Sequence, residues 1–244
     1  MNKKIVSLAG AIGLALSAGA VASDYNVELG GQYVDFDFAE AWGADATIYF
    51  KPVQTGNGPL AEAAFLNRAG NVNFAYLRET SGDFNLPAVG AEAYFGNYYL
   101  AANYARFSNG IKLNDYGIRV GMMLGQNTRG TVGYNRTELP FGIDLDSYTV
   151  GIKHVMMLAG NTALNLEGEA GVVDNGSSDF IYNFQADYYF TPSFSLGARY
   201  SGIESDDEWG LGTRYFFTPR VSGGLEYSRA DGDDIFGLRV AARF

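Results

Sequence analysis

Apolar and polar side chains alternate with a period of two along most of the chain from Asp24 onward, in segments of roughly ten residues. The clearest segment is the last one, whose apolar face consists of Phe236, Leu238, Val240, Ala242 and Phe244. Gly, Asn, Asp, Pro and Ser separate the segments. Because successive side chains of a strand point to opposite faces, the pattern predicts antiparallel strands joined by turns.

One face of each segment is apolar and aromatic, whereas the other face consists of polar residues and glycine. A soluble β-sandwich of this size would contain some nearly continuous apolar strands, and almost none occur here. Aromatic residues gather at segment ends, as in the interfacial girdles of membrane barrels, at Tyr49–Phe50, Tyr98–Tyr99, Tyr188–Phe190 and Tyr215–Phe217. The pattern therefore favours an all-β protein, an antiparallel transmembrane β-barrel, over a soluble sandwich.

The expected barrel has about 14 strands, an even number as in other bacterial outer-membrane barrels, with about 12 as the alternative. The expected spans are 25–36, 42–51, 60–79, 89–96, 98–107, 115–124, 130–138, 145–157, 162–173, 179–190, 194–204, 208–217, 221–229 and 235–244. The alternation slips in the third span, between Phe65 and Val72. We expect either a bulge near residues 68–70 or a short helix at this place.

The N-terminal residues resemble a targeting segment. Lys3 and Lys4 precede an apolar run from Ile5 to Leu16, and Ala20–Ala22 forms an A-x-A cleavage site. The apolar run is shorter than the roughly 20 residues that a transmembrane helix needs. We expect residues 1–22 to be a cleaved signal peptide and residues 23–244 to form a single barrel domain in the outer membrane of a Gram-negative bacterium.

Composition argues against several other functions. The formal net charge is −10, and loss of the two signal-peptide lysines makes it −12, so we expect no nucleic-acid partner. The chain contains no Cys, which removes disulfides and thiol chemistry. Its single histidine, His154, is predicted to face outward near the periplasmic interface, and no Ser or Asp is placed to act with it as a nucleophile. We expect no enzymatic activity, no cofactor and no metal site.

The connections between segments alternate between two kinds. One kind is short and poor in acid, at residues 126–128, 159–161, 191–193 and 218–220. The other kind is acidic, at residues 35–40, 79–83, 144–146, 174–179, 204–208 and 231–234. With both termini in the periplasm, the acidic kind faces outside and forms a rim that includes Asp206, Asp207, Glu208, Asp231, Asp233 and Asp234. Such a rim predicts a weak preference for cations.

Charged residues within the strands are predicted to face the lumen, because an Arg or Lys facing lipid near the midplane costs about 2–4 kcal/mol. The basic ones are Arg119, Lys153, Arg199, Arg214, Arg239 and Arg243. The acidic ones are Glu28, Asp45, Glu92, Glu167, Glu169, Asp187 and Glu226. Expected neighbours on adjacent strands are Arg214 with Glu226, Asp187 with Arg199, and Arg239 with Glu28.

Two functional readings of these charges remain open. They either line a water-filled pore, or they pair across strands and plug a structural or surface-interaction barrel. Barrels of about 8 strands have filled interiors, whereas those of about 16–18 strands leave a channel. The expected strand number lies closer to the open kind, which favours the pore.

Several pieces of the sequence resemble a known family. They are Tyr49–Pro52 followed by Gly58–Leu66, the aromatic-Thr-Pro turns at Phe190–Pro192 and Phe217–Pro219, and the terminal Ala242–Phe244. The chain looks like the bacterial outer-membrane porin superfamily, specifically the small "putative porin" proteins of proteobacteria. This resemblance implies passive diffusion of small hydrophilic solutes, without catalytic residues.

The resemblance also bears on partners. The C-terminal Phe244 is similar to the signal that the barrel-assembly machinery reads, and the expected surroundings are outer-membrane lipid and lipopolysaccharide. Trimeric general porins have about 16 strands and a long third loop inside the lumen, as the family resemblance implies. The corresponding connection here, residues 108–114, is short, so a monomer is favoured over a trimer.

Overall fold

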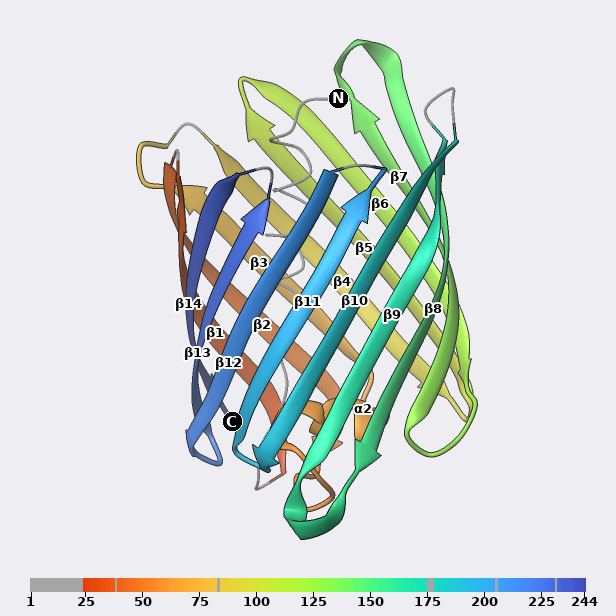
Figure 1. Ribbon diagram of the computed structural model, residues 1–244, viewed down its shortest axis with the longest axis vertical. Coiled ribbons are helices and arrows are strands. Elements are labelled where there is room, and N and C mark those ends of the chain that lie inside the picture. Colours follow the sequence, from red (N-terminus) through yellow and green to blue (C-terminus); the bar gives the residue numbers. More distant parts are fainter. Residues whose placement is uncertain (1–23, 38, 83, 175–177, 205, 231) are drawn as a thin grey trace.

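The computed structural model describes residues 24–37, 39–82, 84–174, 178–204, 206–230 and 232–244. These residues form 14 antiparallel strands that close into one barrel (Figure 1). Each strand pairs with the next in the chain, and β1 pairs with β14 along nine Cα partners from Glu28–Arg243 to Phe36–Ile235. The predicted fold class and the count of 14 strands are confirmed, and 12 is excluded. The predicted signal peptide lies outside the described residues.

The strands run close to the predicted spans. They are β1 Tyr25–Phe36, β2 Ala39–Val53, β3 Asn71–Glu79, β4 Asn85–Phe95, β5 Tyr98–Asn109, β6 Ile111–Met123, β7 Thr128–Leu139, β8 Ile143–Met157, β9 Ala163–Asp174, β10 Ser178–Thr191, β11 Phe194–Ile203, β12 Asp206–Thr218, β13 Val221–Ala230 and β14 Asp233–Arg243. Strand β6 begins four residues earlier than predicted, because its ladder with β5 continues to a tight turn at Gly110, whose φ is +62°. No helix in these ranges is long and apolar enough to cross a membrane.

The two ends of the barrel differ. Tyr25 and Phe244 lie at the end that is lower in Figure 1, called here the terminus end. The strand ends that the predicted acidic connections join lie at the opposite end, called here the acidic end. Short 3-10 turns also occur, at η2 Pro140–Gly142 and η3 Ala159–Asn161.

The predicted strand at 60–79 is wrong in its first half. Residues 60–66 form a 3-10 turn, η1 Leu60–Glu62, and one helical turn, α2 Ala63–Leu66, and only β3 is a strand. The short helix weighed as an alternative is confirmed. Asn67 holds the end of this turn, because its side-chain amide donates to the Ala63 carbonyl at 2.8 Å and to the Gln54 carbonyl at 2.6 Å. The connection 54–70, called here the floor segment, thereby folds into the terminus end of the barrel (Figure 1).

The outer surface carries the apolar side chains, as the alternation predicts. Large apolar residues in mid-strand are exposed by about half, including Val150 at 62%, Leu211 at 55% and Phe184 at 51%. Aromatic residues mark both ends of this surface. Those near the terminus end are Phe50, Phe95, Tyr98, Phe190, Phe217 and Phe244, and those near the acidic end are Trp42, Tyr116, Tyr148, Tyr200 and Trp209. The two groups form belts of the kind that lies at the membrane interfaces.

Part of the inner surface is apolar, which the sequence-based reading did not predict. A buried cluster fills the acidic end on the side of β14 and β1–β5, and it consists of Val34, Phe36, Ala41, Ala75, Leu77, Phe84, Leu86, Ala88, Ala105 and Ile235. A register shift between Tyr25 and Val27 also turns Tyr25 inward, although the alternation had placed both on one face. The open and polar part of the lumen therefore lies against the remaining strands.

The two faces of β10 provide a test of the membrane-facing surface. Phe184 faces outward in mid-strand, whereas its neighbour Asn183 faces the lumen. We expect Phe184→Arg to lower the free energy of unfolding by about 2–4 kcal/mol, because the charge enters lipid. Asn183→Arg, the matched control, is expected to cost much less, because its charge stays in lumen water. Urea unfolding in lipid vesicles measures both, and equal losses would contradict the assignment of faces.

Candidate functional site

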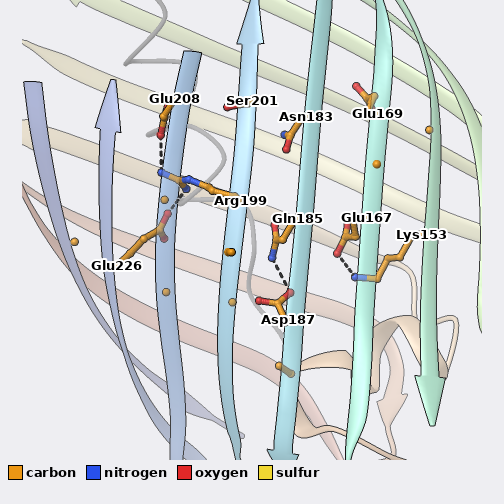
Figure 2. A pocket seen from close by; sticks show the side chains of 18 of the residues that line it. Lys153, Glu167, Glu169, Asn183, Gln185, Asp187, Arg199, Ser201, Glu208 and Glu226 are labelled. Carbon is orange, nitrogen blue, oxygen red and sulfur yellow. Dashed lines mark hydrogen bonds and ion pairs between the residues drawn. The ribbon is translucent and has the colours of Figure 1, made fainter. Parts of the chain in front are cut away.

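The inner wall encloses a polar cavity of about 860 Å³, called here the lumen cavity. Ten of the 13 residues predicted to face the lumen lie along it. They are Arg119, Lys153, Arg199, Arg214, Arg239, Glu92, Glu167, Glu169, Asp187 and Glu226. Figure 2 shows the part of the wall formed by β8–β13, where charged and amide side chains project from neighbouring strands toward one another.

Four further charged residues line the lumen cavity, and they are Glu62, Asp115, Arg129 and Glu208. Asp115 could have been found from the sequence, because it shares the inner face of its predicted strand with Arg119. Arg129 lies one residue before the predicted start of β7. Glu62 could not have been found by alternation, because it belongs to the floor segment and not to a strand.

The remaining three predicted residues, Glu28, Asp45 and Arg243, point inward but do not line the cavity. Glu28 and Arg243 are 0% and 2% exposed and form an ion pair, since β1 and β14 place them side by side. Arg239 Nη2 lies 3.1 Å from Glu28 Oε1 and 2.6 Å from Asp45 Oδ2. The predicted pair of Arg239 with Glu28 is confirmed. These charges form a buried network where the barrel closes, which alternation alone could not distinguish from an open wall.

The partners of Arg199 differ from the prediction. Its guanidinium lies 2.8 Å from Glu208 Oε1 and also forms an ion pair with Glu226 (Figure 2). Asp187 instead accepts hydrogen bonds from Asn165 Nδ2 at 3.0 Å and Gln185 Nε2 at 2.9 Å. The Arg199 side chain reaches past β12 toward β13, away from β10, so pairing by adjacent strands picked the wrong carboxylate. Arg214, predicted to pair with Glu226, faces Gly224 across the ladder.

The prediction that Glu208 belongs to the acidic rim is wrong. It is 2% exposed and points into the barrel, because it shares the inner face of β12 with the lumen-lining residues. Asp206, Asp207, Asp233 and Asp234 lie at the acidic end, and Asp231 lies outside the described residues.

Two of these rim carboxylates point away from the mouth. Asp207 accepts a hydrogen bond from Tyr200 Oη at 2.7 Å and another from the Tyr182 hydroxyl, and Asp234 accepts one from Tyr227 Oη at 2.7 Å. These tyrosines belong to the outer surface, so the two carboxylates lie above the aromatic belt. The negative charge of Asp207 and Asp234 therefore acts less directly on ions that enter the barrel than the sequence predicts.

One acid at this end holds its proton more tightly than usual. Glu204 shares a hydrogen bond with Asp179, and this bond together with the charge of that carboxylate raises the pKa of Glu204 above its ordinary value. In the parts of the chain that the structure describes, no group of three or more His, Cys, Asp or Glu residues could hold a metal ion. His154 lies on the outer face, where its Nδ1 is 2.7 Å from Thr128 Oγ1.

The floor segment is tied to the wall by a buried charge cluster. Lys153 Nζ lies 2.8 Å from Glu62 Oε2 and 2.5 Å from Glu167 Oε1, and Tyr189 Oη donates to Glu62 Oε1 at 2.8 Å. Phe65 packs beneath two cations, with Lys153 Nζ at 5.1 Å and the Arg129 guanidinium carbon at 5.5 Å from its ring centroid. These contacts hold the helical turn as the floor of the lumen cavity.

A second cavity, of about 420 Å³, lies on the other side of the floor segment. Its lining includes Leu66, Arg68 and Met157, whereas Ala64 and Phe65 line the lumen cavity. The helical turn α2 therefore stands between the two cavities, at the terminus end of the barrel.

The lumen cavity carries an excess of negative charge. Its lining contains six basic residues, Arg119, Arg129, Lys153, Arg199, Arg214 and Arg239, and eight acidic residues, Glu62, Glu92, Asp115, Glu167, Glu169, Asp187, Glu208 and Glu226, so its formal charge is 6 − 8 = −2. Asp115 accepts hydrogen bonds from Asn135 Nδ2 at 2.7 Å and Thr137 Oγ1 at 2.8 Å. Asp187 likewise accepts hydrogen bonds from Asn165 and Gln185. Neither Asp115 nor Asp187 forms an ion pair with another of the described residues.

Comparison with known proteins places the chain among porins. A family profile described as "putative general bacterial porin" matches residues 1–139 and 133–244. The crystal structure of the outer membrane protein Omp33 of Acinetobacter baumannii is 31% identical and covers 91% of this chain and 99% of that chain, with a TM-score of 0.78. No curated protein matches the sequence.

More distant structures share the fold alone. The KdgM porin is 9% identical, covers 89% of this chain and 99% of that chain, and has a TM-score of 0.52. A bacterial polysaccharide outer membrane secretin is 10% identical, covers 91% of this chain and 99% of that chain, and has a TM-score of 0.53.

The floor cluster can be tested by its contribution to stability. We expect Lys153→Ala to lower the free energy of unfolding by about 3 kcal/mol, because it leaves the buried Glu62 without its cation. Arg119→Ala is the matched control, since Arg119 and Glu169 are 40% and 31% exposed to the lumen. Its expected cost is about 1 kcal/mol or less, as for other solvent-exposed pairs. Urea unfolding in lipid vesicles compares the two variants, and a smaller loss for Lys153→Ala would contradict the buried tie.

Proposed function

The chain belongs to the "putative general bacterial porin" family and is an outer-membrane porin of a Gram-negative bacterium, and from that premise we propose that it passes small hydrophilic solutes by diffusion with a preference for cations. The observation that carries the preference is the charge of the lumen cavity, where carboxylates outnumber basic side chains by two.

The pairing of these charges supports the same preference. Arg119, Arg199 and Lys153 each contact carboxylates at 2.8 Å or closer. These ion pairs locally neutralise the positive charge of the three basic residues. Asp115 and Asp187 are held by amides and hydroxyls instead, so their charge remains available to a passing ion. A polar passage lined by charge of one sign concentrates counter-ions and repels ions of the same sign.

The floor segment sets the narrowest part of the proposed route. A lumen cavity of about 860 Å³ is large enough for a small solute, but α2 stands between it and the second cavity. In this proposal solutes leave past this segment, so we expect a low rather than a high conductance. The alternative is a closed structural barrel. The same position of α2 favours it if the floor segment leaves no passage between the two cavities.

Orientation and surroundings belong to the same proposal. The acidic end faces the exterior, and the terminus end faces the periplasm. Arg136 lies 3.1 Å from both Asp144 and Asp146 on the outer face of β7 and β8 at the acidic end. Carboxylates at this height would meet lipopolysaccharide, whose phosphates divalent cations can bridge to them. The short connection at Gly110 contains no segment that could fold into the lumen, which favours a monomer over a trimer.

The proposal is tested with the refolded mature protein in a planar bilayer across a salt gradient. Stable ohmic steps with a reversal potential on the cation side are the expected result. A folded and inserted barrel that gives no steps would replace the channel with the closed structural barrel. A reversal potential on the anion side would overturn the cation preference and leave the channel.

The two unpaired carboxylates give a sharper prediction. In Asp115→Asn with Asp187→Asn, the permeability ratio of cation to anion is expected to fall by about twofold, because two negative charges leave the passage. Asp207→Asn is the control, since Asp207 lies on the outer face at the acidic end. Its ratio is expected to match that of the wild type. A larger change in the control than in the double variant would assign the selectivity to the rim.

A further inference from the structure

Three arginines inside the barrel reach across whole strands to their carboxylates. Arg239 on β14 passes β1 to reach Asp45 on β2, with Nη2 at 2.6 Å from Oδ2. Arg199 on β11 passes β12 to pair with Glu226 on β13. Arg119 on β6 passes β7 and β8 to reach Glu169 on β9, with Nη2 at 2.8 Å from Oε2. Because neighbouring strands lie about 4.8 Å apart, the side chains of Arg199 and Arg239 must lie along the wall to cross one strand.

A glycine lies beneath two of these side chains, those of Arg199 and Arg239, where the crossed strand would otherwise present a Cβ. Gly210 is the Cα partner of Arg199, and a Cβ on it would lie 2.9 Å from Arg199 Nε and 3.1 Å from Cγ. A Cβ on Gly30 would lie 2.6 Å from Arg239 Nη2 and 2.3 Å from Asp45 Oδ1. Gly133, the Cα partner of Arg119, differs from these two, because a Cβ on it would lie 3.6 Å from Arg119 Nε, which is an ordinary contact, and 2.6 Å from Thr149 Oγ1.

The backbone does not require glycine at these positions. Gly30 and Gly210 are absent from the described glycines with positive φ, so their conformations are open to any residue. Glycine inside a strand weakens the strand, because it offers no side chain to pack and loses more entropy on folding. The space above the strand is therefore what these glycines provide.

We propose that Gly30 and Gly210, called here the saddle glycines, determine the size and charge selectivity of the lumen by letting Arg239 and Arg199 lie flat against the wall. A side chain at a saddle lifts the guanidinium away from its carboxylate and into the lumen cavity. The passage then becomes narrower, and a positive charge projects into the path of the ions. This inference rests on the proposed conduction, and it assigns a role in selectivity to residues that carry no charge.

The strand β12 supplies a matched pair of variants. Gly210 and Gly212 both face the lumen two residues apart, but a Cβ on Gly212 would meet nothing closer than 3.7 Å. In a planar bilayer across a salt gradient, Gly210→Ala is expected to lower the conductance and to reduce the permeability ratio of cation to anion by about twofold. Gly212→Ala is expected to leave both unchanged. Equal effects of the two variants would overturn the proposal.

A double-mutant cycle assigns the effect to the arginine. In the background of Arg199→Ala, the substitution Gly210→Ala is expected to change neither conductance nor selectivity, because no guanidinium remains to be lifted. An undiminished effect in that background would show that Gly210 acts through the backbone instead, and this result would overturn the proposal.

Two further measurements keep the test independent of folding and of conduction. If Gly210→Ala does not fold, Gly30→Ala takes its place. The atoms that this substitution displaces are the terminal atoms of the Asp45 and Arg239 side chains, which can move without a shift of the backbone. Its control is the adjacent outward-facing Gly31→Ala, where the nearest atom is 4.0 Å away. If the wild type shows no conductance, the proposed function fails. A crystal structure of the alanine variant then tests the role of the saddle glycine. A guanidinium moved off its carboxylate supports the proposal, and an unmoved one overturns it.

Discussion

The interior of this barrel depends on one constraint, which is that ionised side chains cannot face the hydrocarbon without a large cost in free energy. An Arg or Lys near the midplane of the lipid face costs about 2–4 kcal/mol, so the charges of the strands turn inward. Inside, they meet one another in a confined space and pair across the wall, as Arg119 does with Glu169 and Lys153 with Glu167. The pairing leaves Asp115 and Asp187 with polar partners only, and these two carboxylates account for the net negative charge of the lumen cavity.

The two sides of the lumen differ, because one side is filled by apolar side chains and the other is lined by charged ones. The apolar cluster around Phe84 and Leu86 fills the inner face of β1–β5 at the acidic end, whereas most of the charged residues that line the lumen cavity lie on β6 to β13. At the terminus end, Lys153 and Tyr189 hold Glu62 and with it the floor segment. The proposed route therefore runs along a charged wall and ends at the floor segment, a shape that the similarity to Omp33 in overall fold does not by itself specify.

Alternation in the sequence is a physical consequence of the pleat, so it predicts which face a residue occupies. For that reason the 14 strands and the inward direction of Arg119 or Asp187 could be predicted. Alternation does not report how far a side chain reaches or how high it lies, so Glu208 was placed on the rim and Arg199 beside the wrong carboxylate. The floor segment lies outside any strand, so no periodic pattern could place Glu62 in the lumen. Its Phe65 breaks the alternation, and that slip was the one available signal.

The central claim is that small solutes diffuse through the lumen past the floor segment. Osmotic swelling of liposomes that contain the refolded mature protein tests it most directly, with neutral sugars and amino acids of increasing mass as solutes. Swelling that is measurable for the smallest solutes and falls steeply with solute mass is the predicted result. Folded and inserted protein that permits no swelling with any solute would contradict a diffusion channel and leave a closed barrel.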